Sequence, residues 1–131
     1  MTLLAVVLVT GGCGGDGKGG AEGAGTAPPV SLAGAVNNHG AKTASSATVE
    51  LELDDFYFGP TFIKATPGQQ IKIELHNEGA APHTFTMAGV DEELQPGAKK
   101  TITITAPQSG LANFTCRFHV GQGMQGAIYV S

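Results

Sequence analysis

The clearest pattern along the chain is an alternation of apolar and charged residues that begins near position 48. From Val49 to Asp54 each apolar residue is followed by an acidic one. Successive side chains of a β-strand point to opposite faces, so this alternation predicts a strand with one buried and one solvated face. The same period of two recurs over Gln70–His76. No segment after position 48 has the pattern of a long amphipathic helix, so the predicted elements are strands.

Further short apolar segments follow, and turns that contain Gly and Pro separate them. The clearest turn dipeptides are Pro67-Gly68 and Pro96-Gly97. Additional strands are predicted at 62–65, 83–87, 101–105, 112–116 and 127–130. Short strands at regular spacing, punctuated by Gly and Pro, are typical of a β-sandwich. We therefore expect an all-β fold, a small Greek-key β-sandwich.

The segment before these strands has a different composition. Residues 11–47 are mainly Gly, Ala, Ser, Thr and Pro, with few large apolar side chains. Such a stretch buries too little apolar surface to offset the entropy lost on ordering. We therefore divide the chain into a signal segment at 1–12, a flexible linker at 13–47 and one folded domain at 48–131. A domain of this size is one in which a bound metal often adds stability.

The first residues resemble a secretory signal. Leu3–Val9 is an apolar run that is too short to anchor the chain across a bilayer, and small residues follow it. Residues 9–13 resemble the cleavage box of bacterial lipoproteins, in which the residue after the cut is a cysteine that carries a diacylglycerol. The resemblance implies lipid attachment at Cys13, with plain secretion as the alternative. Both interpretations place the protein outside the cytoplasm, in the periplasm or at the cell surface, and lipid attachment would anchor it to the membrane.

The charge balance argues against one class of partner. The chain has 7 Lys and Arg residues against 11 Asp and Glu residues, a net charge of −4. No basic stripe is present, which argues against nucleic acid. Acidic groups at 50–55 and 91–93 form either a solvated face or a surface that attracts a basic partner.

One short segment near the C-terminus contains several side chains that bind metals. Phe114–Met124 has the pattern Cys-x2-His-x4-Met, with Cys116 at the inward end of a predicted strand. His119 and Met124 follow in one loop that contains Gly, and a loop this short holds the three side chains near one point. A second imidazole, that of His83, begins a different predicted strand.

Two imidazoles, one thiolate and one thioether form a mixed ligand set. A plane of two His and one Cys with a weak axial Met is typical of a blue copper electron-transfer site. Structural zinc sites contain paired Cys or His, and a catalytic iron site would include a carboxylate, which the motif lacks. We therefore predict one copper ion per chain, held by His83, Cys116, His119 and Met124.

At these residues the chain resembles the cupredoxin family and, in the spacing of its ligand loop, plastocyanins most of all. Matching features outside the loop are Phe58, Pro60, the two Pro-Gly turns and the segment Met124–Val130. The resemblance covers most of residues 48–131. It implies a cupredoxin-like sandwich with the same four ligands. It also implies that His119 lies near the surface, where electrons pass to a partner.

Several neighbouring residues need separate interpretations. Thr84 stands where many cupredoxins have an asparagine that braces the two ligand loops, and its hydroxyl can still form hydrogen bonds. Arg117 brings a positive charge next to the cysteine. We do not expect His39 or His76 to bind the metal, because His39 lies in the linker and His76 on a polar strand face. Met87 is expected in the core.

Three functions are compatible with this site: a single-electron carrier, a copper carrier or buffer, and a copper subunit docked to a larger redox enzyme. A stand-alone enzyme is not expected, because copper reductases and oxidases need further His-rich centres and the chain has only four histidines. Three methionines are few for a copper carrier, so the sequence favours the electron carrier. We expect a monomer that exchanges electrons with a donor and an acceptor redox protein.

Overall fold

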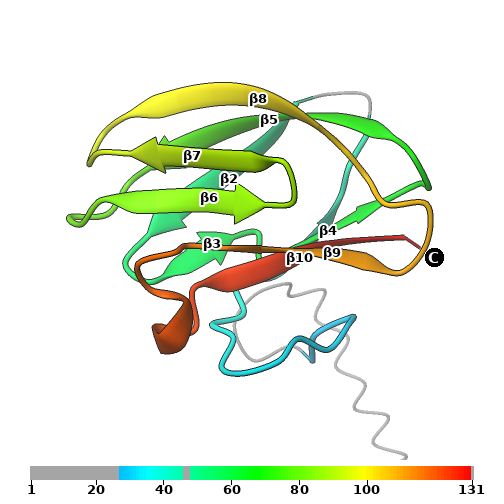
Figure 1. Cartoon of the computed structure of the whole chain (residues 1–131), viewed down its shortest axis with the longest axis horizontal. Helices are drawn as coiled ribbons and strands as arrows, with labels where there is room; N and C mark the ends of the chain where they lie inside the picture. Colours follow the sequence, from blue (N-terminus) through cyan, green and yellow to red (C-terminus); the bar gives the residue numbers. More distant parts are fainter. Residues whose placement is uncertain (1–26, 46–47, 131) are drawn as a thin grey trace, which may run out of the picture.

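The predicted strands pack face to face as two sheets in the computed structural model, which describes residues 27–45 and 48–130 (Figure 1). One sheet has the order β1-β4-β10-β9-β6-β7 and the other β3-β2-β5-β8, which confirms the all-β sandwich. No helix within the described ranges is long and apolar enough to cross a membrane. The elements are β1 Ala41–Thr43, β2 Val49–Asp54, β3 Tyr57–Gly59, β4 Phe62–Ala65, β5 Gln70–Asn77, β6 His83–Met87, β7 Val90–Leu94, β8 Lys99–Thr105, β9 Leu111–Thr115, the 3₁₀ helix η1 Val120–Gln122 and β10 Gln125–Val130.

Both sheets contain parallel and antiparallel pairs. β2 pairs with β5 in parallel, whereas β5 pairs with β8 antiparallel. In the larger sheet β10 lies between β4, its parallel neighbour, and β9, its antiparallel neighbour. Parallel neighbours need a crossover connection, and here the chain crosses from one sheet to the other to make it. The loop that enters β10 is therefore attached to a strand that is paired on both sides.

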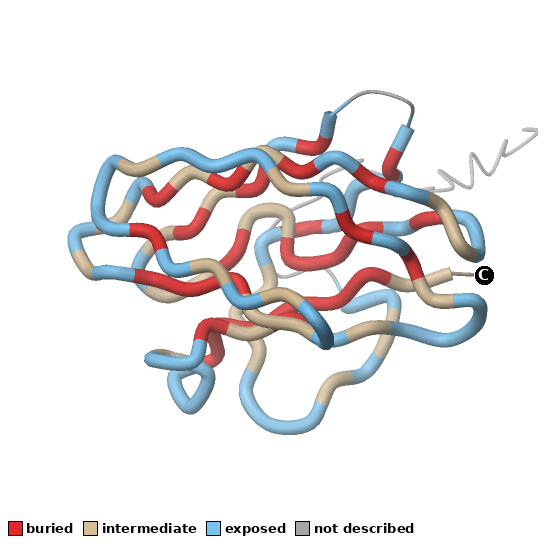
Figure 2. Tube along the Cα trace, turned by 45° about the horizontal axis from the view of Figure 1, so that its top comes forward, coloured by how far each residue is buried: buried red, intermediate tan, exposed pale blue. Residues whose placement is uncertain are grey.

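Apolar side chains from both sheets fill the space between them. Figure 2 marks the buried residues in red along the Cα trace. The rings of Phe58, Phe85 and Phe114 are fully buried. Phe58 meets Phe114 edge-on with ring centroids 4.9 Å apart and meets Phe85 at 6.2 Å. Burial of each such ring contributes about 1.5–3 kcal/mol to the free energy of unfolding. Cys116 and Met124 belong to the same core cluster, so the predicted ligand loop is joined directly to the core.

Three short strands were not predicted: β1, β3 and β7. β6 and β7 form a hairpin with the two-residue turn Ala88-Gly89, because Met87 pairs with Val90. β7 is an edge strand, and its central positions, Asp91–Glu93, are all acidic. Charged residues are common on edge strands, where they discourage pairing with other chains. Because three acidic residues follow one another in β7, its sequence does not show the alternation of apolar and polar residues that predicts a strand.

The structure places part of the expected linker against the sandwich. β1 pairs in parallel with β4, and the next residue, Ala44, is buried. The backbone N–H groups of Thr61 and Phe62 both donate to the carbonyl of Gly40, at 3.0 Å. Composition did not indicate these contacts, because backbone groups make them and every residue type has a carbonyl. The signal segment at 1–12 and Cys13 lie outside the described residues.

Candidate metal centre

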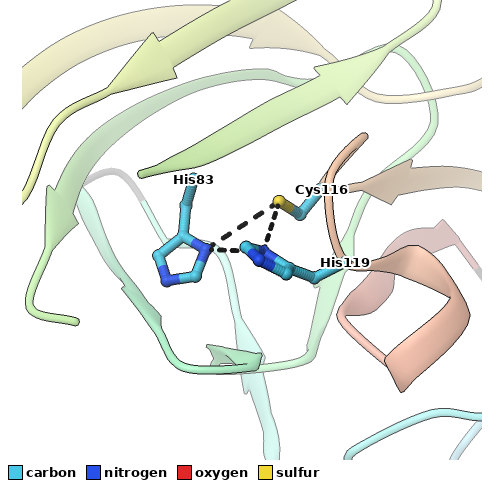
Figure 3. A group of neighbouring side chains, drawn as sticks. All are labelled: His83, Cys116 and His119. Atoms are coloured by element: carbon cyan, nitrogen blue, oxygen red, sulfur yellow. Dashed lines mark hydrogen bonds between the residues drawn. The ribbon is translucent and has the colours of Figure 1, made fainter. Parts of the chain in front are cut away.

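Three of the predicted ligands converge where β6 begins and β9 ends (Figure 3). The Nδ1 atoms of His83 and His119 lie 3.2 Å apart. Sγ of Cys116 lies 3.9 Å from Nδ1 of His83 and 3.4 Å from Nδ1 of His119. Nitrogen and sulfur ligands lie about 2.0–2.3 Å from a transition metal, so atoms that share one ion are roughly 3–4 Å apart. The three side chains therefore fit a common metal ion.

The loop after β9 sets its own geometry through backbone hydrogen bonds. The N–H of His119 donates to the carbonyl of Cys116 at 3.1 Å, and that of Met124 donates to the carbonyl of His119 at 3.3 Å. The N–H of Cys116 in turn donates to the carbonyl of Met124 at 3.0 Å. Gly123 has a φ of +98°, which glycine adopts without strain. Met124 is fully buried, and with His83 the loop residues form a cluster like a type 1 copper site.

Thr84 connects β6 to the ligand loop. Its hydroxyl accepts a hydrogen bond from the backbone N–H of Arg117 at 2.8 Å. Its own backbone N–H points at Sγ of Cys116, 3.4 Å away. This N–H therefore helps to fix the position of the sulfur. The hydrogen-bonding capacity predicted for this hydroxyl is therefore used to brace the site.

Asp55 contacts the first histidine, and the sequence did not single it out. Its Oδ1 lies 2.7 Å from Nε2 of His83, and its carboxylate accepts hydrogen bonds from the N–H groups of Ala80 and Ala81. The bond from Ala80, followed by the contact with His83, lowers the pKa of Asp55 below 3.8, so the carboxylate is charged at neutral pH. In the sequence this residue is one of several acidic residues near the end of β2, and only its place directly after the strand sets it apart.

His119 lies nearer the surface than His83, whose side chain is fully buried. The ring of Phe56 packs against that of His119, with centroids 4.6 Å apart. Phe118 and Val120 flank His119 in the sequence and are 46% and 39% exposed. Burial lowers the pKa of His119 below 6.5, and the nearby His83 lowers it further. A neutral imidazole is the form that binds a metal.

The positive charge of Arg117 is paired. Its Nε donates to Oδ1 of Asp91 at 2.9 Å, and its guanidinium lies 5.3 Å from the ring centroid of Phe118. The hydrogen bond from Arg117, followed by one from Thr86, lowers the pKa of Asp91 below 3.8. The expected charge next to the cysteine is therefore held against the β7 edge rather than free above the site.

An N-terminal segment, Ala33–Asn37, crosses the ligand loop. The backbone N–H of Asn37 donates to the carbonyl of Gly123, and its side-chain amide donates to that of Gln122, both at 2.9 Å. The amide of Gln125 donates to two carbonyls of the segment, at 2.7 and 2.9 Å. In Figure 1 the cyan segment runs beside the end of the molecule where β10 begins. Residues expected in the linker therefore hold the loop from outside.

The other histidines lie apart from the metal cluster, as predicted. His39 stacks on the ring of Tyr57, with centroids 3.5 Å apart and planes 9° apart. His76 lies on the outer face of the smaller sheet, with Nδ1 3.7 Å from a carboxylate oxygen of Glu78. Met87 packs against the core cluster as a partly buried side chain.

Comparison with known proteins agrees with this geometry. A family model described as "Cupredoxin-like domain" matches residues 30–130. Plastocyanin from Daucus carota is 30% identical over 99 residues, which cover 65% of this chain and 100% of that protein. The solved structure of dithionite-reduced auracyanin from Roseiflexus castenholzii has a TM-score of 0.57 at 23% identity and covers 67% of this chain and 98% of its own. The metal-binding domain of the Streptococcus pneumoniae Cu(I)-exporting P-type ATPase CopA has a TM-score of 0.57 at 17% identity, with 70% and 95% covered. The two structural likenesses show a shared fold.

Proposed function

Because the chain belongs to the cupredoxin-like family, we propose that it is a mononuclear type 1 (blue) copper protein that carries single electrons between redox proteins outside the cytoplasm. The observation that carries this proposal is the convergence of two imidazole nitrogens and a buried thiol, all within 4.8 Å of one another. Such a set, with a methionine close in the chain, fits blue copper better than structural zinc or non-haem iron.

In this proposal His83, Cys116, His119 and Met124 would hold the copper ion. Copper supplies the one-electron couple. The protein keeps the ligands in place: His83 and Cys116 are fully buried, and Thr84 joins their two strands. Ligands that move little between the two oxidation states lower the reorganisation needed for electron transfer.

The exposed edge of His119 is the proposed contact with donor and acceptor. His119 is partly exposed, whereas His83 is fully buried, so the path from the metal to a partner is shorter through His119. Phe118 and Val120 give this edge an apolar rim. An apolar rim suits a brief contact, because it excludes water without requiring a fixed set of ion pairs. We expect the protein to act there as a monomer.

We also propose that the protein is attached to a membrane through a lipid on Cys13. The support is the sequence alone: an apolar run at Leu3–Val9 followed by a cysteine box that resembles those of bacterial lipoproteins. Mass spectrometry of the membrane fraction tests this proposal. The expected result is a mature chain that begins at Cys13 and carries a diacylglycerol. An unmodified mature N-terminus at another residue would contradict it.

A copper carrier or buffer would use the same four side chains, as would a copper subunit docked to a larger redox enzyme. The burial of His83 and Cys116 favours retention of the ion, because delivery requires ligands that an acceptor can reach.

We do not propose an enzyme, because copper reductases and oxidases need further His-rich centres. Two of the four histidines lie in this site, and the other two lie apart from it.

Visible absorption and cyclic voltammetry of the full chain loaded with one equivalent of copper test the proposal. We expect an intense thiolate-to-copper band in the oxidised protein and a reversible one-electron wave. The variant Met124→Leu should keep the band and raise the reduction potential, because the Met124 sulfur would tune the potential without creating the colour. An oxidised protein without the band would reject the blue copper site. Rapid loss of Cu(I) to a chelator during cycling would favour a copper carrier.

A further inference from the structure

The contact between Asp55 and His83 lies on the side of the imidazole that faces away from the other ligands. Oδ1 of Asp55 is 2.7 Å from Nε2 of His83, while Nδ1 of the same ring faces Sγ of Cys116 at 3.9 Å. The side chain of His83 is 0% exposed and that of Asp55 is 28% exposed. Because packing restricts the motion of a fully buried ring, this contact is better defined than an ion pair between two flexible surface side chains.

The backbone around the carboxylate fixes its position. The N–H of Ala80 donates to Oδ2 of Asp55 at 3.0 Å, and that of Ala81 donates to Oδ1 at 3.3 Å. Gly79 leaves the space that the pair occupies: a Cβ there would overlap Oδ1 of Asp55 and lie 2.9 Å from Nε2 of His83. The loop before β6 is therefore shaped around this hydrogen bond.

We propose that Asp55 is a positioning residue for the copper site, one that presents Nδ1 of His83 to the metal and favours Cu(II) over Cu(I). A carboxylate only accepts hydrogen bonds, so Nε2 carries the proton and Nδ1 keeps its lone pair for the metal. A carboxylate partner also makes an imidazole a stronger electron donor. A stronger donor stabilises the more highly charged ion. This inference rests on the proposed copper site.

The first test uses the full chain without copper, so it does not depend on the metal. Nitrogen NMR of the histidine side chains distinguishes a proton on Nε2 from one on Nδ1. We expect His83 to carry its proton on Nε2 in the natural chain, and Asp55→Ala to lose this preference. A proton on Nδ1 of His83 in the natural chain would overturn the proposal, whatever the chain does with copper.

The second test compares two conservative variants in the copper-loaded chain. Asp55→Asn keeps the shape and an acceptor oxygen but removes the charge, so the fold and the blue band should persist. The ratio of Cu(II) to Cu(I) at a fixed applied potential should fall about tenfold. This change corresponds to a rise of about 59 mV in the reduction potential of a one-electron couple. The matched control is Asp54→Asn, which removes a charge one residue away. The Asp54 side chain accepts hydrogen bonds from Tyr57 and from the backbone N–H of Asp55 rather than from His83, and asparagine keeps an acceptor oxygen.

Three outcomes distinguish the proposed role of Asp55 from a general effect of charge and from a failure of the proposed copper function. A rise in potential for Asp55→Asn that is clearly larger than for Asp54→Asn supports the proposal. Equal shifts overturn it, because they would reflect only the loss of a nearby charge. If the natural chain binds no copper or shows no blue band, the proposed function fails, and the NMR test still decides whether Asp55 sets the tautomer of His83.

Discussion

The two halves of the metal site are built in different ways. The ligand loop, residues 116–124, is one short piece of chain whose backbone bonds hold Cys116, His119 and Met124 to one another. The other half, the His83 side, combines the first residue of β6 with Asp55 and the loop at 79–81, which are far apart in the sequence. The spacing of residues along the chain is enough to bring the side chains of the ligand loop together. The residues of the His83 side come together only when the two sheets pack.

This difference predicts how each half responds to change. Changes in the ligand loop should act on the proposed metal directly, because most of its residues are proposed ligands or their neighbours in the chain. Changes on the His83 side should act on the proposed metal indirectly, by shifting the His83 ring. The position of this buried ring depends on core packing and on the carboxylate of Asp55. The variants below test this contrast, from the largest expected effect to the smallest.

The largest effect is expected from Cys116→Ser in the ligand loop. The change is nearly isosteric, so the fold should persist, but the hydroxyl supplies neither the thiolate charge nor the soft sulfur that copper(II) needs for its colour. We expect complete loss of the intense visible band of the oxidised protein. Circular dichroism is the control for the fold. A variant that keeps both its fold and its band would show that Cys116 is not a ligand.

On the His83 side, Gly79→Ala should disturb the pair behind the ring. The added Cβ would overlap Oδ1 of Asp55 and approach Nε2 of His83, so one of them must move. Such overpacking costs about 1–3 kcal/mol of unfolding free energy. We expect urea denaturation to show that loss and copper titration to show weaker binding. Unchanged stability with weaker copper binding would show that the substitution affects the site without affecting the fold. If neither the stability nor the copper binding changes, the loop at 79–81 accommodates the added methyl group without cost.

In the ligand loop, the matched change is Gly123→Ala. The φ of +98° at this position is strained for any residue with a Cβ, and the new methyl would lie 2.8 Å from side-chain atoms of Asn37. The strain costs about 1–2 kcal/mol. We expect a lower urea midpoint and a changed reduction potential, because the turn that spaces His119 and Met124 must adjust. A loss of stability equal to that of Gly79→Ala with no change in potential would contradict the contrast between the halves.

The link between the halves is tested by Thr84→Val. Valine keeps the shape of threonine but cannot accept the hydrogen bond from the N–H of Arg117, so that donor loses its partner. The expected cost is about 1 kcal/mol in unfolding free energy. The control is Thr84→Ser, which keeps the hydroxyl. If serine and valine cost the same, packing rather than the hydrogen bond explains the effect.

The smallest effect is expected at the surface, from the pair of Asp91 with Arg117. The pair lowers the pKa of Asp91 below 3.8, so the folded state binds the proton less well than the unfolded chain. Its stabilisation is therefore present above about pH 4 and is lost as the pH falls through the lowered pKa. Asp91→Asn should remove this acid dependence and lower the stability at neutral pH by the same amount, which is small because the pair is exposed. Urea midpoints between pH 3 and 7 would measure it.

Alternation and turn dipeptides were enough to predict the all-β sandwich and most of its strands. They missed three short strands: β3, β7, which is an acidic edge strand, and β1, whose pairing with β4 uses backbone groups in a segment of small residues. A strand leaves a clear sequence signal when apolar and polar residue types alternate over several positions, and none of these short strands shows such a run.

The sequence by itself was enough to predict the four candidate metal ligands, and it limits the local geometry of the loop because Cys116, His119 and Met124 are close together along the chain. Only the tertiary structure brought His83 to them, placed Asp55 behind its ring and laid residues 33–37 across the loop. Contacts between residues far apart in the chain depend on how the two sheets pack, and packing is a property of the whole core rather than of any one segment.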